Sequence, residues 1–85
     1  MGSFEIVFRS SVEKELKKIP KQDQIGILRR IQQLADDPRP DGCKKLSGQE
    51  RYRIRQGDYR FLNEIEDQRL IVVIVRIGHR RDVYS

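Results

Sequence analysis

A basic β-hairpin at residues 51–60 constrains the fold of this chain more than any other stretch. Gly57-Asp58 is a two-residue turn signal with glycine first, which is typical of a type II′ turn. With these two residues as the loop, strands of about residues 51–56 and 59–66 pair in an antiparallel manner. The facing pairs are then Gln56 with Tyr59, Arg55 with Arg60, Ile54 with Phe61 and Arg53 with Leu62.

Side chains alternate between the two faces of a strand, so Arg53, Arg55 and Arg60 are expected on one face of this hairpin. Guanidinium groups that face one another repel unless an anion lies between them. This face therefore predicts an anion-binding site. The opposite face should supply core residues, namely Tyr52, Ile54, Tyr59 and Phe61.

The residues before the hairpin predict one strand and two helices. Phe4-Glu5-Ile6-Val7-Phe8 is rich in β-forming residues and predicts a strand. Ser10 and Glu13 match a capping box, so a first helix should begin there. Its apolar stripe should consist of Val12, Leu16 and Ile19.

A second helix is predicted over residues 21–36, separated from the first by Pro20 and ended by the loop at residues 36–42. Its apolar stripe should consist of Ile25, Leu28, Ile31, Leu34 and Ala35. Two helices joined at one proline can form a helical hairpin that covers one face of a sheet. Residues 43–50 should be loop with at most a short strand.

The last strand, at about residues 70–77, is apolar on both faces and is expected at the centre of the sheet. With Asp67-Gln68 as the preceding turn, Glu66 and Arg69 form a cross-strand pair of opposite charge. The order β-α-α-β-β-β predicts an α+β domain spanning residues 1–85. A small antiparallel sheet should carry the helical hairpin on one face.

The same register places Tyr59 opposite Arg76, so the last strand leaves the sheet beside the Gly57-Asp58 turn. The segment that follows it should then lie near Arg55 and Arg60. The chemically useful residues of that segment are His79, Arg80, Arg81 and Tyr84.

Charge favours an anionic partner. The chain of 85 residues has 18 Lys and Arg against 13 Asp and Glu, a net charge of +5. A basic domain of this size suits a polyanion, an acidic protein segment or both, although a well-solvated surface is the simpler alternative. Lys44 and Lys45 extend the basic region and are candidate contacts to a nucleic-acid backbone.

Several classes of chemistry are excluded by what the chain does not contain. Cys43 is the only cysteine and His79 the only histidine, which excludes a disulfide framework and a Cys/His metal site. The acidic residues form no catalytic pair, and no glycine-rich phosphate loop occurs. No signal peptide and no stretch of membrane-spanning length is visible, so a reducing cytoplasm is the expected location, with no membrane partner.

The remaining cluster of arginines suits cleavage of RNA, because the 2′-hydroxyl of RNA can itself attack the neighbouring phosphate. The protein need only accept that proton and stabilise the charged transition state, with no metal or cofactor. Arginines do the second task well, since they are planar, always charged and bidentate to phosphate. Tyr84 and His79 are the candidates for the proton acceptor, and Tyr84 as an ordinary packing residue is the alternative.

These segments together resemble the RelE/ParE superfamily of toxins from toxin–antitoxin systems, most closely the RelE-like branch. The resemblance covers nearly the whole chain in the right order. The matching segments are Phe4-Glu5-Ile6-Val7-Phe8, Glu15-Leu16-Lys17-Lys18-Ile19-Pro20, Asp37-Pro38, Lys45-Leu46-Ser47-Gly48, Tyr52-Arg53-Ile54-Arg55, Gly57-Asp58-Tyr59-Arg60 and Gly78-His79-Arg80-Arg81-Asp82-Val83-Tyr84.

The resemblance implies a compact fold like that of small microbial ribonucleases. It also implies a ribosome-dependent endoribonuclease that cuts mRNA in the ribosomal A site without a metal and is inhibited by a cognate antitoxin. Lys44 and Lys45 are then candidate contacts to ribosomal RNA. The functional positions of the family fall on Arg53, Arg55, Arg60, Arg80 and Tyr84. The first two are often lysine in the family, and arginine donates a proton less readily. The resemblance leaves a second function open, since ParE-like members poison DNA gyrase and cut nothing. An inactive module that only binds an antitoxin is a third alternative.

Overall fold

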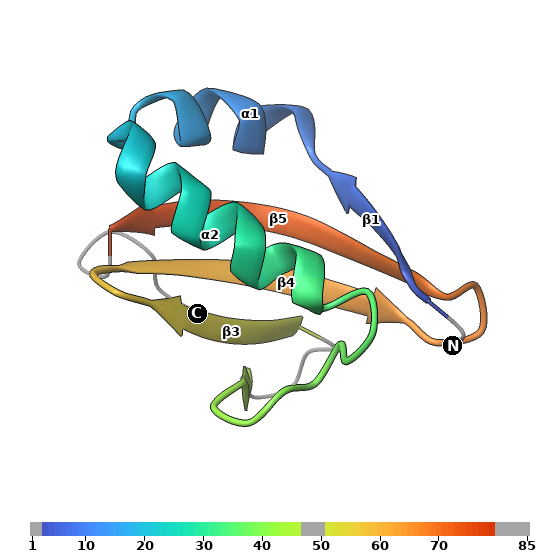
Figure 1. Cartoon of the computed structure of the whole chain (residues 1–85). Helices are drawn as coiled ribbons and strands as arrows, with labels where there is room; N and C mark the ends of the chain where they lie inside the picture. The colour runs from blue at the N-terminus through green and yellow to red at the C-terminus, as the bar shows by residue number, and fades with distance from the viewer. Residues whose placement is uncertain (1–2, 47–50, 80–85) are drawn as a thin grey trace.

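The computed structural model of the chain describes residues 3–46 and 51–79, which form five strands and two helices (Figure 1). In chain order these are β1 (Glu5–Phe8), α1 (Ser10–Lys17), α2 (Lys21–Gln33), β2 (Lys44–Lys45), β3 (Arg51–Gln56), β4 (Tyr59–Glu66) and β5 (Ile71–His79). The predicted order is confirmed, and β2 is the short strand allowed for between residues 43 and 50.

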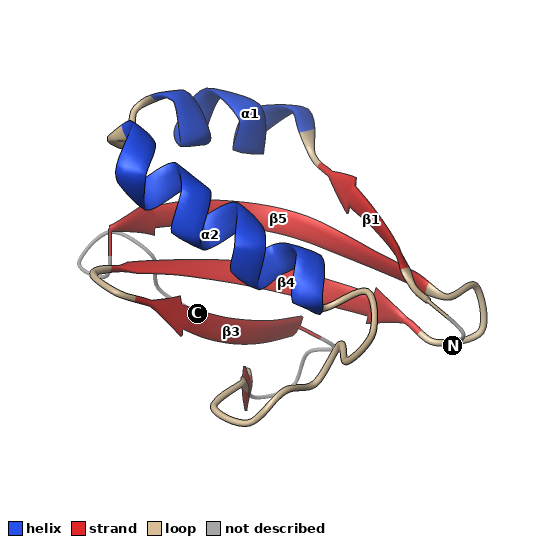
Figure 2. Cartoon of the chain, in the orientation of Figure 1, coloured by secondary structure: helices blue, strands red, loops and turns tan. Residues whose placement is uncertain are grey.

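The strands form one sheet in the order β1-β5-β4-β3-β2 (Figure 2). The strands from β2 to β5 pair in an antiparallel manner, as predicted, whereas β1 runs parallel to β5. A parallel neighbour needs a long crossover, to which α1 and α2 belong. Both helices lie over the same face of the sheet (Figure 1), which confirms the α+β class with a helical hairpin on one face.

The predicted hairpin between β3 and β4 is confirmed residue by residue. Arg55 pairs with Arg60, and Gln56 pairs with Tyr59 next to the two-residue loop. Gly57 has a φ of 59°, which a type II′ turn requires at its first loop position and which most residues avoid. Gly57 therefore sets the register that aligns the arginines of the two strands.

The apolar face of the hairpin is buried beneath the helices. Phe61 is fully buried at the centre of this layer. The main core consists of Val12, Ile19, Ile27, Ile31, Leu34, Tyr52, Ile54, Phe61, Ile65, Val72, Ile74 and Ile77. A second, smaller cluster is formed by Leu46, Leu62 and Val75. Because β5 lies between β1 and β4 and contributes to both clusters, the prediction of a central strand covered on both faces is confirmed.

The second helix is rotated relative to the predicted apolar stripe. Ile31 and Leu34 of that stripe are buried as predicted, but Ile25 and Leu28 are 55% and 38% exposed. Ile27, which was not in the predicted stripe, is fully buried. Both sets of residues fit helical spacing, so the sequence alone does not select the phase. The helix also ends at Gln33 rather than at residue 36.

The first helix begins without the predicted capping box. Arg9 is its N-cap, and no side chain caps the helix. The reason lies in β1, because the Arg9 amide donates to the Ile74 carbonyl oxygen of β5 at 3.1 Å. Pairing with β5 thus extends to Arg9, and Ser10 falls inside the first turn of the helix.

The turn between β4 and β5 is longer than predicted. Glu66 pairs with Ile71, so the turn contains four residues, 67–70, and Leu70 lies in the left-handed region with a φ of 53°. Glu66 and Arg69 do form an ion pair, at 3.7 Å, but within the turn rather than across two strands.

A β-bulge in β5 shifts the register further. Asn63 pairs with Ile74 and Leu62 with Arg76, so Val75 is an extra residue on β5. Tyr59 consequently pairs with His79 rather than with Arg76, and the predicted register of this pair is wrong. β5 nevertheless ends beside the Gly57-Asp58 turn, as predicted.

Candidate functional site

The predicted arginines line a hollow at the turn end of the β3–β4 hairpin. This basic hollow has a volume of about 120 Å³ and is lined by Gly42, Lys44, Arg53, Arg55 and Arg60. Lys44 on β2 pairs with Arg53 on β3, and Arg55 pairs with Arg60 on β4. Three neighbouring strands therefore place four cationic side chains on one face of the sheet.

None of these four cationic side chains has a hydrogen-bond or ion-pair partner among the described residues. Arg53 and Arg60 are half-buried, which weakens solvent screening of their mutual repulsion. Like charges placed directly opposite each other destabilise a hairpin. An arrangement of this kind is stabilised when an anion binds between the guanidinium groups.

Arginines elsewhere in the described structure show the contrast. Arg51 lies on the same strand as Arg53, yet its Nη2 atom lies 2.7 Å from Glu64 Oε2 on the facing strand. Arg76 lies 3.7 Å from Glu15 of α1. Within the described part of the chain, the basic hollow is thus distinguished by the lack of acidic partners for its cationic side chains and not merely by the presence of arginine.

The loop that supplies Gly42 and Lys44 is tied to the opposite end of the sheet. Arg39 donates two hydrogen bonds to the Asp67 carboxylate, at 3.0 and 2.9 Å, and a third to the Tyr52 hydroxyl at 3.0 Å. The hydrogen bonds from Arg39 hold the pKa of Asp67 below its usual value. The same pairing, with a further contribution from Tyr52, raises the pKa of Arg39 above its ordinary value.

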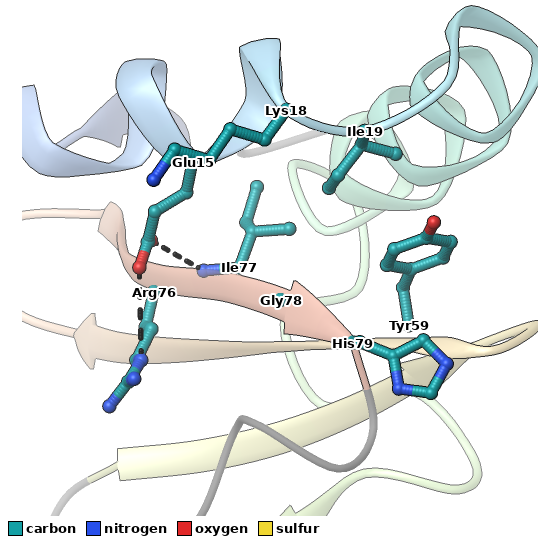
Figure 3. A pocket seen from close by; sticks show the side chains of 8 residues that line it. All are labelled: Glu15, Lys18, Ile19, Tyr59, Arg76, Ile77, Gly78 and His79. Carbon is teal, nitrogen blue, oxygen red and sulfur yellow. Dashed lines mark hydrogen bonds and ion pairs between the residues drawn. The ribbon is translucent and has the colours of Figure 1, made fainter.

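His79 lies outside the basic hollow. Its ring packs edge-on against Tyr59, with ring centroids 5.8 Å apart and planes at 81° (Figure 3). Tyr59 packs against the core on the helix-covered face, whereas Arg60 points to the other face. The hollow of about 310 Å³ that His79 lines also contains Glu15 and Lys18 of the α1 region. The structure therefore separates His79 from the arginines by the thickness of the sheet.

The remaining predicted residues divide into two groups. Lys45 pairs with Tyr52 and so points to the face opposite to Lys44. Arg80, Arg81 and Tyr84 lie outside the described residues, and their roles stay predictions.

Gly42 and Glu15 are the residues of these hollows that the sequence did not single out for a role. Gly42 has a φ of 90° and brings the loop backbone against the basic hollow. The sequence feature that could have indicated this position is the run Pro40-Asp41-Gly42, which is typical of a turn with a left-handed glycine. Glu15 accepts a hydrogen bond from the Ile77 amide at 2.9 Å (Figure 3), a contact between residues 62 positions apart that no local pattern predicts.

Within residues 3–46 and 51–79, no group of three or more His, Cys, Asp or Glu side chains is arranged to hold a metal ion. Cys43 is half-buried and packs against the main core, as an ordinary small apolar side chain does. In this part of the chain no helix is both long enough and apolar enough to span a bilayer.

Comparison with known proteins assigns the family. The sequence model described as "ParE toxin of type II toxin-antitoxin system, parDE" matches residues 6–84. The chain belongs to this toxin family. It is therefore a type II toxin of a toxin–antitoxin system, and its resemblance to RelE-like members is confirmed by the relatives below.

Toxin RelG of Mycobacterium tuberculosis is 28% identical over 85 residues, covering 95% of both chains. The toxin–antitoxin complex RelBE2 of M. tuberculosis contains a chain that superposes with a TM-score of 0.82 at 26% identity, covering 92% of this toxin and 99% of that chain. The archaeal RelE–RelB complex of Pyrococcus horikoshii gives a TM-score of 0.84 at 24% identity, covering 95% and 99%. The last similarity supports the fold alone.

Proposed function

We propose that this toxin is a ribosome-dependent endoribonuclease that cleaves mRNA in the ribosomal A site and so inhibits translation. The observation that carries the proposal is the basic hollow, where four cationic side chains lack any acidic partner among the described residues. A phosphodiester in RNA is an anion that fits such a site and that brings its own nucleophile. Ribosomal RNA is proposed as a further contact.

In the proposed reaction, the 2′-oxygen attacks the adjacent phosphorus and loses its proton to a base. The bond from phosphorus to the 5′-oxygen breaks, and that oxygen takes up a proton. The products are a 2′,3′-cyclic phosphate and a free 5′-hydroxyl group. Atoms and charges balance without a metal or cofactor.

Arg53, Arg55 and Arg60 would stabilise the charge that develops on the phosphorane oxygens. The fixed strand register of all three, and the half-buried setting of Arg53 and Arg60, favour preorganisation, because the side chains need little rearrangement as charge develops. Arg80 is proposed to act with them. Arg81, Lys44 and Lys45 are proposed to contact the RNA backbone.

Tyr84 is the proposed proton acceptor or orienting group. His79 is less suited to this role, because it lies on the helix-covered side with Tyr59. A tyrosine near several guanidinium groups would have its ionised form favoured.

We further propose a cognate antitoxin protein as the inhibitory partner. The relatives from M. tuberculosis and P. horikoshii were solved as complexes of this kind. The net charge of +5 suits an acidic antitoxin segment, and the exposed side chains of Ile25 and Leu28 offer apolar contacts.

Primer extension on mRNA after induction of the toxin tests the proposal. The wild type should produce new 5′ ends at codon-spaced positions, and Arg60→Ala combined with Arg80→Ala should reduce them by about a hundredfold. Arg69→Ala is the matched control, because Arg69 is an exposed arginine in the β4–β5 turn. An absence of new ends in the wild type, or undiminished cleavage by the double variant, would contradict the proposal.

Inhibition of DNA gyrase without nucleolysis is the second candidate, because the matching family is described by its ParE members. Supercoiling assays with purified gyrase, run beside measurements of protein synthesis, separate the two functions. We expect protein synthesis to stop while supercoiling continues. Loss of supercoiling while protein synthesis continues would favour the gyrase inhibitor.

A further inference from the structure

A second polar hollow lies on the helix-covered side of the same hairpin. It has a volume of about 350 Å³ and is lined by Gly26, Arg29, Arg30, Gln33 and Gln56. We call it the helix-side hollow. Its walls come from the outer surface of α2 and from the last residue of β3, so it forms where the helix crosses the turn end of the hairpin.

Gly26 and Gln56 form the base of the helix-side hollow. A Cβ atom at position 26 would lie 3.3 Å from the side-chain amide nitrogen (Nε2) of Gln56. The glycine therefore permits a close approach between α2 and this side chain of β3. Glycine in the middle of a helix lowers stability by roughly 1 kcal/mol relative to alanine. The glycine therefore allows the Gln56 side chain to lie directly against α2 and to line the helix-side hollow.

Among residues 3–46 and 51–79, the lining of the helix-side hollow is cationic and includes no acidic and no apolar side chain. Arg29 is exposed and has no hydrogen-bond or ion-pair partner among the described residues. Arg30 makes two long hydrogen bonds, to Gln33 at 3.3 Å and to the Asp41 carbonyl oxygen at 3.4 Å. Asp58, in the adjacent turn, lines neither hollow.

The two hollows lie on opposite faces of one strand end. Arg55 lines the basic hollow, and the next residue, Gln56, lines the helix-side hollow. β2 pairs only with Tyr52 and Arg53, so the edge of β3 from Ile54 onward has no neighbouring strand among the described residues. The loop at Asp41 and Gly42 lies beside this edge, because Asp41 accepts a hydrogen bond from Arg30 and Gly42 lines the basic hollow. A flexible polyanion that reaches both hollows would therefore cross the edge next to this loop.

We propose that the helix-side hollow binds the RNA strand next to the nucleotide held in the basic hollow. Arg29 would contact a flanking phosphate, while the amides of Gln33 and Gln56 would hydrogen-bond to ribose or base edges. This inference rests on the proposed function, and it adds a second contact that lies on α2 rather than on the sheet. The RNA strand would bend over the open edge of β3.

The lining favours nucleic acid over a protein partner. Protein–protein interfaces have an apolar centre, whereas protein–nucleic acid interfaces are more polar and more positive. Arginine and glutamine side chains are both common in contacts to phosphates and bases. The apolar groove between β1 and α2, lined by Ile6, Phe8 and Leu28, has the opposite character and lies elsewhere on the helix.

Equilibrium binding of two single-stranded RNAs of different length tests this inference. A three-nucleotide RNA can fill only the basic hollow, whereas a twelve-nucleotide RNA can reach both. Every ribose of both probes carries a 2′-O-methyl group, which blocks the attacking hydroxyl and so prevents cleavage. Arg29→Gln should weaken binding of the longer probe about tenfold at low salt and reduce the slope of log K against log salt by about 0.7, as loss of one single-strand phosphate contact does. The shorter probe should bind unchanged.

Arg69→Gln is the control of matched charge, because it removes one exposed arginine at the far end of the sheet, and it should leave both probes unaffected. Equal weakening of both probes by Arg29→Gln, or of neither, would overturn the inference. Loss of antitoxin affinity with unchanged RNA binding would assign the hollow to the protein partner instead. Because the probes are not cleaved, these results stand apart from the primer-extension test, whose failure alone would count against the proposed function.

Discussion

Arg51 and Arg55 lie on the same face of the same strand, yet their surroundings differ because of the residue that faces each one. Arg51 faces Glu64 and pairs with it at 2.7 Å, whereas Arg55 faces Arg60. A directly opposite residue is the main determinant of cross-strand energy. At the scale of single residues, the candidate site is thus a place where the usual charge pairing of this sheet is missing.

Replacing Arg60 by glutamate should make the protein more stable and abolish its proposed activity. Arg60→Glu would face Arg55 as Glu64 faces Arg51, which removes a repulsion and adds an attraction, raising the free energy of unfolding by about 0.5–1 kcal/mol. Cleavage of mRNA should be lost. Urea denaturation and primer extension measure the two effects.

Arg60→Gln is the control for this prediction, since it removes the repulsion without adding a pair. Its stability should lie between those of the wild type and Arg60→Glu. A fall in stability for Arg60→Glu would show that Arg55 and Arg60 do not repel each other in the folded protein.

At the scale of elements, α2 shows how two apolar patterns can compete within one helix. Ile27 and Ile31 face the sheet, while Ile25 and Leu28 face outward. Each pair has a spacing that a helix places on one side. Packing against β3 and β4 decides which pair is buried, and the exposed pair remains available to a partner.

Serine substitutions should distinguish the two faces of α2. Ile27→Ser removes a fully buried side chain and should lower the free energy of unfolding by about 2–5 kcal/mol, whereas Ile25→Ser should change it by less than about 0.5 kcal/mol. Thermal or urea denaturation measures both. Equal losses for the two variants would mean that the phase of the helix differs from the one described.

The end of β5 depends on α1. β1 pairs with β5 only up to Ile74, so the outer edge of the last residues of β5 has no strand beside it among the described residues. The Glu15 carboxylate takes the place of that strand by accepting a hydrogen bond from the Ile77 backbone amide (Figure 3). This single side chain links the first helix to the strand that leads into the C-terminal segment.

Glu15→Ala should therefore loosen the end of β5 more than Glu15→Gln, which keeps an acceptor oxygen. We expect faster hydrogen exchange at the Ile77 amide and a loss of about 1 kcal/mol in stability for the alanine variant alone. Glu13→Ala, an exposed change on the same helix, should leave the Ile77 amide protected. Identical exchange at the Ile77 amide in all three variants would contradict a stabilising role of the Glu15–Ile77 hydrogen bond.

At the scale of the whole molecule, the loop between α2 and β2 and the turn between β4 and β5 are joined by the Arg39–Asp67 pair. These segments are 28 residues apart in sequence, and the loop continues into Gly42 and Lys44 of the basic hollow. The pair lies at the surface, so its contribution is expected to be modest. It nevertheless connects the two ends of the sheet through one loop.

The Arg39–Asp67 pair should make stability depend on pH. Because the pKa of Asp67 is lowered in the folded state, its contribution is present above the pKa of the unfolded chain and is lost as pH falls through the lower, folded value. Asp67→Asn should therefore be less stable than the wild type at neutral pH, and the difference should disappear in acid.

Urea denaturation at a series of pH values measures this difference. Glu66→Gln is the control, because it removes a neighbouring carboxylate that does not contact Arg39. A difference between wild type and Asp67→Asn that persists unchanged into acid would exclude the proposed linkage.

The sequence by itself determined the local structure that contains the candidate site. Gly57-Asp58 specified the turn, the two-residue period placed Arg53, Arg55 and Arg60 on one face, and the aromatic residues between them identified the buried face. These features depend on short-range backbone geometry, which neighbouring residues control. The order of helices and strands could be predicted from the sequence for the same reason.

Only the tertiary structure decided the features that depend on contacts between distant segments. The phase of α2, the bulge that brings His79 opposite Tyr59, and the Glu15 contact to Ile77 each arise from packing between elements. Each of these features is stabilised by residues that are distant in the sequence, so no local stretch of sequence predicts it. The lack of acidic partners around the basic hollow, as far as the described residues show it, belongs to this class too, because ion pairing in the sheet depends on which strands become neighbours.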